Sequence, residues 1–84
     1  MNNLDLGLLR TLVTVEKTNT FSGAAQVLFK TQSAISQQMQ KLEQQMGYPL
    51  FQKKGRRLVL TMQGKQLAEY GRRLLAINDE VLRT

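Results

Sequence analysis

The sequence predicts a mainly α-helical domain in which three short helices form the core, a small β-hairpin follows, and a long helix ends the chain. Two patterns predict the helices: apolar residues recur at intervals of three and four, and capping residues stand at the expected ends. A third pattern, two short apolar segments on either side of a basic, glycine-containing stretch, predicts the hairpin. Eighty-four residues provide one small domain with a modest core and little room for an enclosed catalytic pocket.

The first expected helix covers residues 4–17, where leucines and valines fall on two adjoining stripes. Asp5 in its first turn and Lys17 in its last turn would complement the helix dipole. After a polar break, Thr20 or Ser22 can cap a second, short helix. The apolar face of this helix is small, so another helix can approach it closely. It consists of Ala24, Ala25, Val27 and Leu28.

The third expected helix runs from Ser33 to Met46, with Thr31 as its N-cap and Gly47 as its left-handed C-terminal cap. Its inward stripe has intervals of four, three and four residues and consists of Ile35, Met39, Leu42 and Met46. Its opposite face is uncharged but can form hydrogen bonds, and consists of Ser33, Ser36, Gln37, Gln40 and Gln44. Two helices joined by a tight polar turn form a helix-turn-helix arrangement.

Pro49 stops any continuation of the third helix. Residues 50–52 and 58–60 are apolar segments that we expect to pair as a two-stranded hairpin with Gly55 at its tip. Four cations surround this glycine: Lys53, Lys54, Arg56 and Arg57.

The last expected helix covers about residues 62–83, and Thr61 can cap it. A seam with intervals of three and four, typical of paired helices, consists of Leu67, Tyr70, Leu74, Ile77 and Val81. A second apolar line can dock on the core of the same chain and consists of Ala68, Leu75 and Leu82. With two apolar faces, this helix has more surface to bury than one small domain would cover.

Basic charge is concentrated in the middle of the chain. The net charge is +6, and residues 17–67 contain eight basic side chains and a single acid, Glu43. A positive segment of this kind indicates a polyanionic partner such as nucleic acid. A solvated surface that only aids solubility would carry the same charge pattern.

Composition excludes several kinds of site. The chain has no cysteine and no histidine, so disulfides, thiolate or imidazole metal sites and the commonest general base are excluded. We therefore expect no metal and no cofactor. No apolar run is long enough to span a bilayer, and residues 1–5 lack the features of a signal peptide. These observations favour a cytoplasmic protein without a membrane partner.

The polar face of the third helix suits double-stranded DNA. The major groove admits an α-helix, glutamine can bond bidentately to adenine, and serine can donate or accept. The expected DNA contacts on and after this helix are Thr31, Gln32, Ser33, Ser36, Gln37, Gln40 and Pro49. In the hairpin, the contacts to phosphate or the minor groove are Lys53, Lys54, Arg56 and Arg57. A solvent-facing helix and a hairpin kept soluble by charge would show the same patterns.

Several ordered motifs resemble those of LysR-type transcriptional regulators. Residues 21–28 resemble the family's F-S-x-A-A-x-x-L motif, and residues 31–39 resemble its recognition helix, [ST]-Q-S-A-[LIV]-S-x-Q-[ILM]. Residues 42–51 match L-E…G-x-P-L-F, and residues 55–64 are similar to R-x-x-x-L-T-x-A-G. The resemblance extends from about Leu6 to the final helix, and the order and spacing of the motifs make it specific.

The resemblance implies a winged helix-turn-helix in residues 1–60 and a linker helix in residues 61–84 through which two chains pair. It implies a homodimer, or a tetramer for the intact protein, and a C-terminal domain that binds a small-molecule effector and is absent from these 84 residues. The sequence departs from the family at Gln37 and Gln40, where arginine or lysine is frequent. This departure favours adenine-type readout and gives the wing more of the phosphate contacts.

Three other functions fit the sequence less well. An enzyme would need acid–base groups, and we find no suitably spaced pair of carboxylates. A membrane-surface or protein-interaction module could use the basic final helix, but its acids dilute the positive face: Glu69, Asp79 and Glu80. An RNA-binding module would need exposed aromatics. The five aromatics are expected mostly in the core or the seam, and are Phe21, Phe29, Tyr48, Phe51 and Tyr70.

Overall fold

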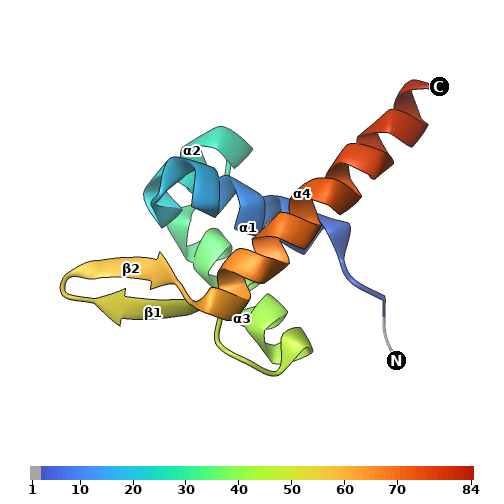
Figure 1. Cartoon of the computed structure of the whole chain (residues 1–84). Coiled ribbons are helices and arrows are strands. Elements are labelled where there is room, and N and C mark those ends of the chain that lie inside the picture. Colours follow the sequence, from blue (N-terminus) through green and yellow to red (C-terminus); the bar gives the residue numbers. More distant parts are fainter. Residues whose placement is uncertain (1–2) are drawn as a thin grey trace.

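The computed structural model describes residues 3–84, and Met1 and Asn2 of the expected N-terminal unit lie outside the described residues. Its elements, in chain order, are α1 (Leu6–Thr18), α2 (Phe21–Leu28), α3 (Gln32–Met46), β1 (Phe51–Lys54), β2 (Arg57–Leu60) and α4 (Met62–Arg83). Figure 1 shows that the hairpin projects from one side of the helical body, and that α4 crosses α1 and extends past it to the C-terminus. This is the mainly helical, winged helix-turn-helix fold that the sequence predicts.

Side-chain caps fix the start of every helix. Asp5, expected in the first turn of α1, is its N-cap instead, because its carboxylate accepts hydrogen bonds from the backbone N–H of Gly7 (2.8 Å) and Leu8 (3.3 Å). The other N-caps accept from the amide three residues further along, and are Thr20, Thr31 and Thr61. Gly47 ends α3 with φ of 80°, a conformation that favours glycine. Of the four N-caps and this glycine, only Asp5 was not predicted as a cap.

The core lies where α1, α2, α3 and the first half of α4 meet. Its largest fully buried side chains are Leu9, Leu12, Ile35, Met39, Leu42 and Leu50. The inward stripe of α3 is confirmed, and Met46 at the end of the helix is half-buried and packs against the core. Thr11, 3% exposed, donates a hydrogen bond to Gln38 Oε1 at 2.6 Å. This bond joins α1 to α3 and satisfies the buried hydroxyl.

α4 packs along α1 in the antiparallel direction. Gly71 allows the close approach, because a Cβ added there would lie 3.2 Å from Val13 Cγ2. Two ion pairs join the same helices, Arg10 with Asp79 and Arg72 with Glu16. The earlier residue of α1 pairs with the later residue of α4, which fixes the antiparallel sense. On α4, the buried residues facing the body are Gly64, Leu67, Ala68, Gly71 and Leu75.

The hairpin is longer than expected. Its strands pair antiparallel from Phe51 opposite Leu60 to Lys54 opposite Arg57, so three of the four cations lie within strands rather than in the turn. Gly55 supplies the turn with φ of 66°. At the base, the ring of Phe51 meets the ring of Phe21 edge to face, with centroids 5.1 Å apart. This contact attaches the hairpin to α2.

Phe29 departs from the expectation that the aromatics lie mostly in the core or the seam. It is the C-cap of α2, with φ of 56° and ψ of 47°, and its side chain is 95% exposed. Its backbone N–H bonds to the carbonyls of Ala25 and Gln26, so the chain turns here and the phenyl ring leaves the core. For a residue with a Cβ, this left-handed conformation costs about 1–2 kcal/mol.

Candidate nucleic-acid interface

The outer face of α3 is polar, uncharged and exposed to solvent. Four exposed residues repeat at intervals of four, three and four, and are Ser33, Gln37, Gln40 and Gln44. Because the buried stripe has the same intervals, these residues lie on the opposite side of the helix. Ser36 is half-buried beside them, and Lys41 adds a charge at the other flank. None of the four side chains forms a hydrogen bond within residues 3–84, so their amide and hydroxyl groups can meet base edges.

Thr31 and Gln32 lie at the start of α3. The Thr31 hydroxyl accepts a hydrogen bond from the N–H of Ala34 at 3.0 Å, so its side chain has a structural role as a cap. Gln32 is exposed in the first turn, where unpaired N–H groups and the helix dipole favour an anion such as phosphate. Both residues, predicted as DNA contacts, therefore lie at the positive end of this helix.

Glu43 joins the C-terminal end of α3 to the base of the wing, which we define as residues 51–60. Its Oε2 accepts hydrogen bonds from the N–H of Leu50 (2.8 Å) and of Phe51 (3.3 Å). The carboxylate of Glu43, the single acid of the basic segment, is therefore engaged in hydrogen bonds within the domain. This role could not be predicted from the sequence, because the partners of Glu43 lie seven and eight residues further along, beyond any local pattern.

Thr61 attaches the other side of the wing base to α4. Its hydroxyl donates to the carbonyl of Pro49 at 2.8 Å and accepts from the N–H of Gly64 at 3.0 Å. Its own N–H donates to the carbonyl of Leu50 at 2.9 Å. A Cβ at Gly64 would lie 2.3 Å from that same Leu50 oxygen, so only glycine permits this approach. Pro49, predicted as a DNA contact, is exposed within this connection.

The wing carries unpaired positive charge. Its four cations are exposed, and none has a carboxylate partner among the described residues. They are Lys53, Lys54, Arg56 and Arg57. The ion pairs found within residues 3–84 use arginines of α1 and α4 instead: Arg10, Arg72 and Arg73. The wing cations can therefore approach phosphates without first breaking an internal pair.

A groove joins the wing to the start of α3. Among its lining residues are Gln32, Arg56 and Arg57, which the sequence analysis assigned to two separate parts of the site. Asn19 and Thr20 line it as well and were not predicted as site residues. The polar break between the first two helices was the only signal for them. Gln40 and Pro49, by contrast, do not line this groove.

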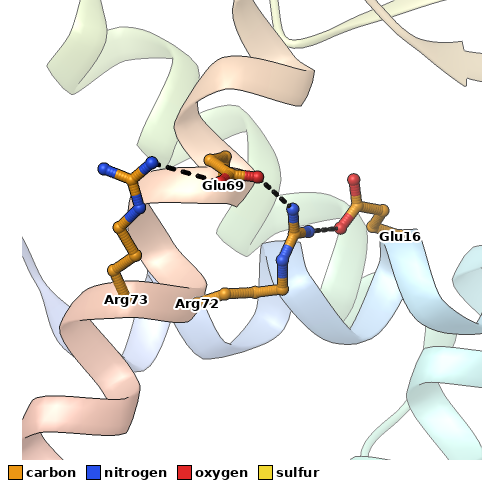
Figure 2. Close-up of polar contacts among 4 residues, drawn as sticks. All are labelled: Glu16, Glu69, Arg72 and Arg73. Carbon is orange, nitrogen blue, oxygen red and sulfur yellow. Dashed lines mark hydrogen bonds and ion pairs between the residues drawn. The ribbon is translucent and has the colours of Figure 1, made fainter.

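Two of the three acids of α4, Glu69 and Asp79, are paired with arginines. Figure 2 shows Arg72 between Glu69 and Glu16, with Arg73 reaching the same Glu69 carboxylate. The distances to Glu69 are 2.8 Å from Arg72 and 3.3 Å from Arg73. The hydrogen bond from Arg72 lowers the pKa of Glu69 below its ordinary value. Of these pairs, the one between Arg72 and Glu16 joins α4 to α1, and the other two hold the Glu69 carboxylate within α4.

The expected dimer seam divides into two parts. Leu67 is only 5% exposed and belongs to the core of its own chain, so a partner could not reach it. The seam residues that remain exposed are Tyr70, Leu74, Ile77 and Val81. Leu67 lies where the two apolar lines of α4 meet, and the rotation of α4 against α1 turns it inward.

The guanidinium of Arg73 lies 5.5 Å from the ring centroid of Tyr70 and covers part of that ring. Leu82, expected to dock on the core, is instead exposed.

Comparison with known proteins agrees with this geometry. Residues 6–65 match the family model described as "Bacterial regulatory helix-turn-helix protein, lysR family". The HTH-type transcriptional regulator PecT of Dickeya dadantii (strain 3937) is 54% identical over 78 residues, which are 93% of this chain and 25% of PecT. The chain thus spans about a quarter of the length of this relative.

Two solved structures are similar in fold. The first is the BenM_DBD/catB site 1 DNA complex, with a TM-score of 0.88 and 30% identity, covering 95% of this chain and 86% of that one. The second is the CbnR_DBD-DNA complex, with a TM-score of 0.85 and 28% identity, covering 93% and 90%. With its matching motifs, its fold and a relative of 54% identity, the chain belongs to the lysR family of bacterial regulatory helix-turn-helix proteins.

Proposed function

We propose that this chain is the DNA-binding unit of a transcription regulator and that it binds double-stranded DNA as a homodimer. One observation carries the proposal: an exposed polar stripe on α3 lies in the same domain as a wing whose four cations have no carboxylate partner. The two similar structures that were solved as DNA complexes support it.

In the proposed complex, α3 enters the major groove and the wing contacts phosphates or the minor groove. The contacts from α3 and its flanks are Thr31, Gln32, Ser33, Ser36, Gln37, Gln40 and Pro49. Those from the wing are Lys53, Lys54, Arg56 and Arg57. The phosphate contacts supply affinity for any duplex, and the α3 face supplies the choice of sequence.

The wing assignment is tested by the salt dependence of binding. Replacing Arg56 and Arg57 by glutamine should weaken binding to every duplex, and the slope of log affinity against log salt should fall by about 0.9 for each lost phosphate contact. As a matched control, Arg73→Gln with Arg83→Gln removes two positive charges from α4 instead of the wing and should keep the wild-type slope. An unchanged slope in the wing variant would contradict the assignment.

We further propose that residues 1–60 form the DNA-reading unit and that residues 61–84 pair two chains. The exposed apolar stripe on α4 supports this division, with Leu67 now excluded, and consists of Tyr70, Leu74, Ile77 and Val81. A symmetric dimer presents two recognition helices to two half-sites, so the target is an interrupted inverted repeat. Each half-site alone should bind weakly, because the second contact of a dimer forms at high effective concentration.

The dimer is tested by Leu74→Glu. Leu74 is 38% exposed, so the charge falls on the stripe without entering the core. Sedimentation should show a monomer, circular dichroism should show an intact fold, and DNA affinity should fall sharply. Ala76→Glu places the same charge on another exposed face of the same turn and should stay dimeric. A Leu74→Glu protein that remains dimeric would refute the pairing.

The proposed activity is occupancy of DNA, not catalysis, and the named relatives of this chain are transcriptional regulators. No helix in residues 3–84 combines the length and apolar character needed to cross a membrane. We place the regulator in the cytoplasm, where bacterial DNA is found. In the whole protein we propose that a small-molecule effector binds outside these 84 residues and that dimers can associate into tetramers.

A further inference from the structure

The six glutamines of α3 have different surroundings. Gln38 accepts the hydrogen bond from buried Thr11, so it is used inside the domain. Gln37, Gln40 and Gln44 are exposed on the outer stripe, and Gln45 is exposed on another side of the helix. The Thr11 bond therefore helps fix the rotation of α3, and with it the set of amides that faces outward.

The outer stripe lacks the side chains that read G·C pairs most specifically, and its serines can bond to either kind of pair. Guanine is read mainly by arginine or lysine at O6 and N7, and cytosine by a carboxylate at its N4 amino group. α3 contains no arginine, and its only acid, Glu43, accepts two backbone N–H groups at the wing base. Lys41 is its only cation and is exposed at the flank of the stripe, not on it.

The stripe also has a defined reach. From Ser33 to Gln44 the helix rises about 16 Å at 1.5 Å per residue. Stacked bases are about 3.4 Å apart, so the stripe can follow roughly five base pairs. The Glu43 bonds join the C-terminal end of α3 to the wing base, which limits tilting of the helix relative to the wing.

We propose that α3 reads A·T base pairs, with Gln37 and Gln40 bonded to the N6 and N7 atoms of adenine, and that it makes no selective contact to guanine. This inference rests on the proposed function, since it names the bases that the same site selects. The exposed wing arginines fit it, because the narrow minor groove of A·T tracts attracts arginine.

The test begins with duplexes selected by this protein from a random library. In the selected half-site, each adenine is then replaced by 7-deazaadenine, and each guanine by 7-deazaguanine, which keep base pairing but lack the N7 acceptor. Replacing a contacted adenine should weaken binding roughly two- to tenfold, the effect of one lost hydrogen bond. Replacing any guanine in the half-site should leave affinity unchanged.

Protein variants connect each base to a side chain. Gln37→Ala should weaken binding to the natural half-site by roughly 5- to 150-fold and should abolish the effect of 7-deazaadenine at one position. Gln40→Ala should do the same at another position. Gln45→Ala removes the same amide from the same helix, away from the stripe, and should keep the full response to 7-deazaadenine.

The outcomes separate this inference from the function on which it rests. Selected half-sites with an invariant G·C pair, weakened by 7-deazaguanine and indifferent to 7-deazaadenine, would overturn the adenine readout while leaving DNA binding intact. An equal loss in Gln45→Ala would also overturn it. A library from which no sequence is enriched would refute the proposed function, and the adenine readout with it.

Discussion

Gly64 is where α4 passes closest to the base of the wing, and replacing it by alanine tests that contact directly. The added Cβ would lie 2.3 Å from the carbonyl oxygen of Leu50 and 3.0 Å from Leu60 Cδ2. The Leu50 oxygen cannot easily move away, because it belongs to the backbone and accepts the N–H of Thr61. The start of α4 and the wing base must therefore separate.

The magnitude follows from three contributions. Overpacking costs about 1–3 kcal/mol, with the upper end expected against a backbone atom. Weakening the hydrogen bond from Thr61 to Leu50 costs about 1 kcal/mol. Alanine regains about 1 kcal/mol of helix propensity over glycine. The free energy of unfolding should fall by about 2–3 kcal/mol, a large part of the 4–13 kcal/mol or so expected for a domain of this size.

Gly71→Ala is the matched control on the same helix. Its Cβ would lie 3.2 Å from a side-chain methyl, Val13 Cγ2, which has to move by only a few tenths of an ångström, so the propensity gain should offset the crowding and leave stability within about 1 kcal/mol of the wild type. Urea unfolding followed by circular dichroism, at one protein concentration, measures both. At a slope of about 1 kcal/mol per molar urea, the Gly64→Ala midpoint should fall by about 2–3 M. A wild-type midpoint for Gly64→Ala would refute the reasoning, as would an equal loss in Gly71→Ala.

Three further predictions follow from other contacts. Phe29→Gly should raise the free energy of unfolding, measured in urea, by about 0.5–1 kcal/mol, because glycine accepts the left-handed conformation and the exposed ring has no packing to lose. A clear loss of stability would contradict the exposure of this ring. The hydrogen bond from Arg10 lowers the pKa of Asp79 below its ordinary value of 3.8, so the pair stabilises the folded protein at neutral pH. This stabilisation is lost as the pH falls below 3.8 and then through the lower pKa that Asp79 has in the folded state. Acid unfolding of Asp79→Asn should lack this part of the pH dependence, and an unchanged pH profile would show that the pair contributes nothing. Thr61→Ala should lower the free energy of unfolding by about 1–2 kcal/mol, since it removes the α4 cap and the bond to Pro49. Thr61→Ser keeps the hydroxyl and should retain most of the wild-type stability.

Features with local causes could be predicted from the sequence. Thr31, Gly47 and Thr61 mark helix ends because capping depends on a side chain and the few amides or carbonyls next to it. The buried and polar faces of α3 follow from its periodicity, since one helical repeat fixes both. The uncharged stripe of the candidate interface could therefore be found without a structure.

Features that depend on how distant elements meet could not be predicted. Leu67 fits the seam by its spacing, and only the rotation of α4 against α1 shows that it faces the core. Glu43 stands alone among basic residues, and its partners become visible only when the wing base folds back onto α3. For Phe29, sequence patterns treat an aromatic as buried by default, although the turn after α2 directs its side chain outward.

The packing of α4 on α1 also bears on the operator. Contacts continue from Gly71 against Val13 to the Arg10–Asp79 pair near the end of α4, so the described part of the chain has no hinge between the helical body and the exposed apolar stripe. In the proposed dimer, the two recognition helices are then held at one distance and one angle. DNA turns once in about 10.5 base pairs, so about five extra pairs between the half-sites would put one of them on the far side of the duplex. The proposed dimer would thus select the spacing between half-sites, and not only their bases, through contacts that never touch DNA.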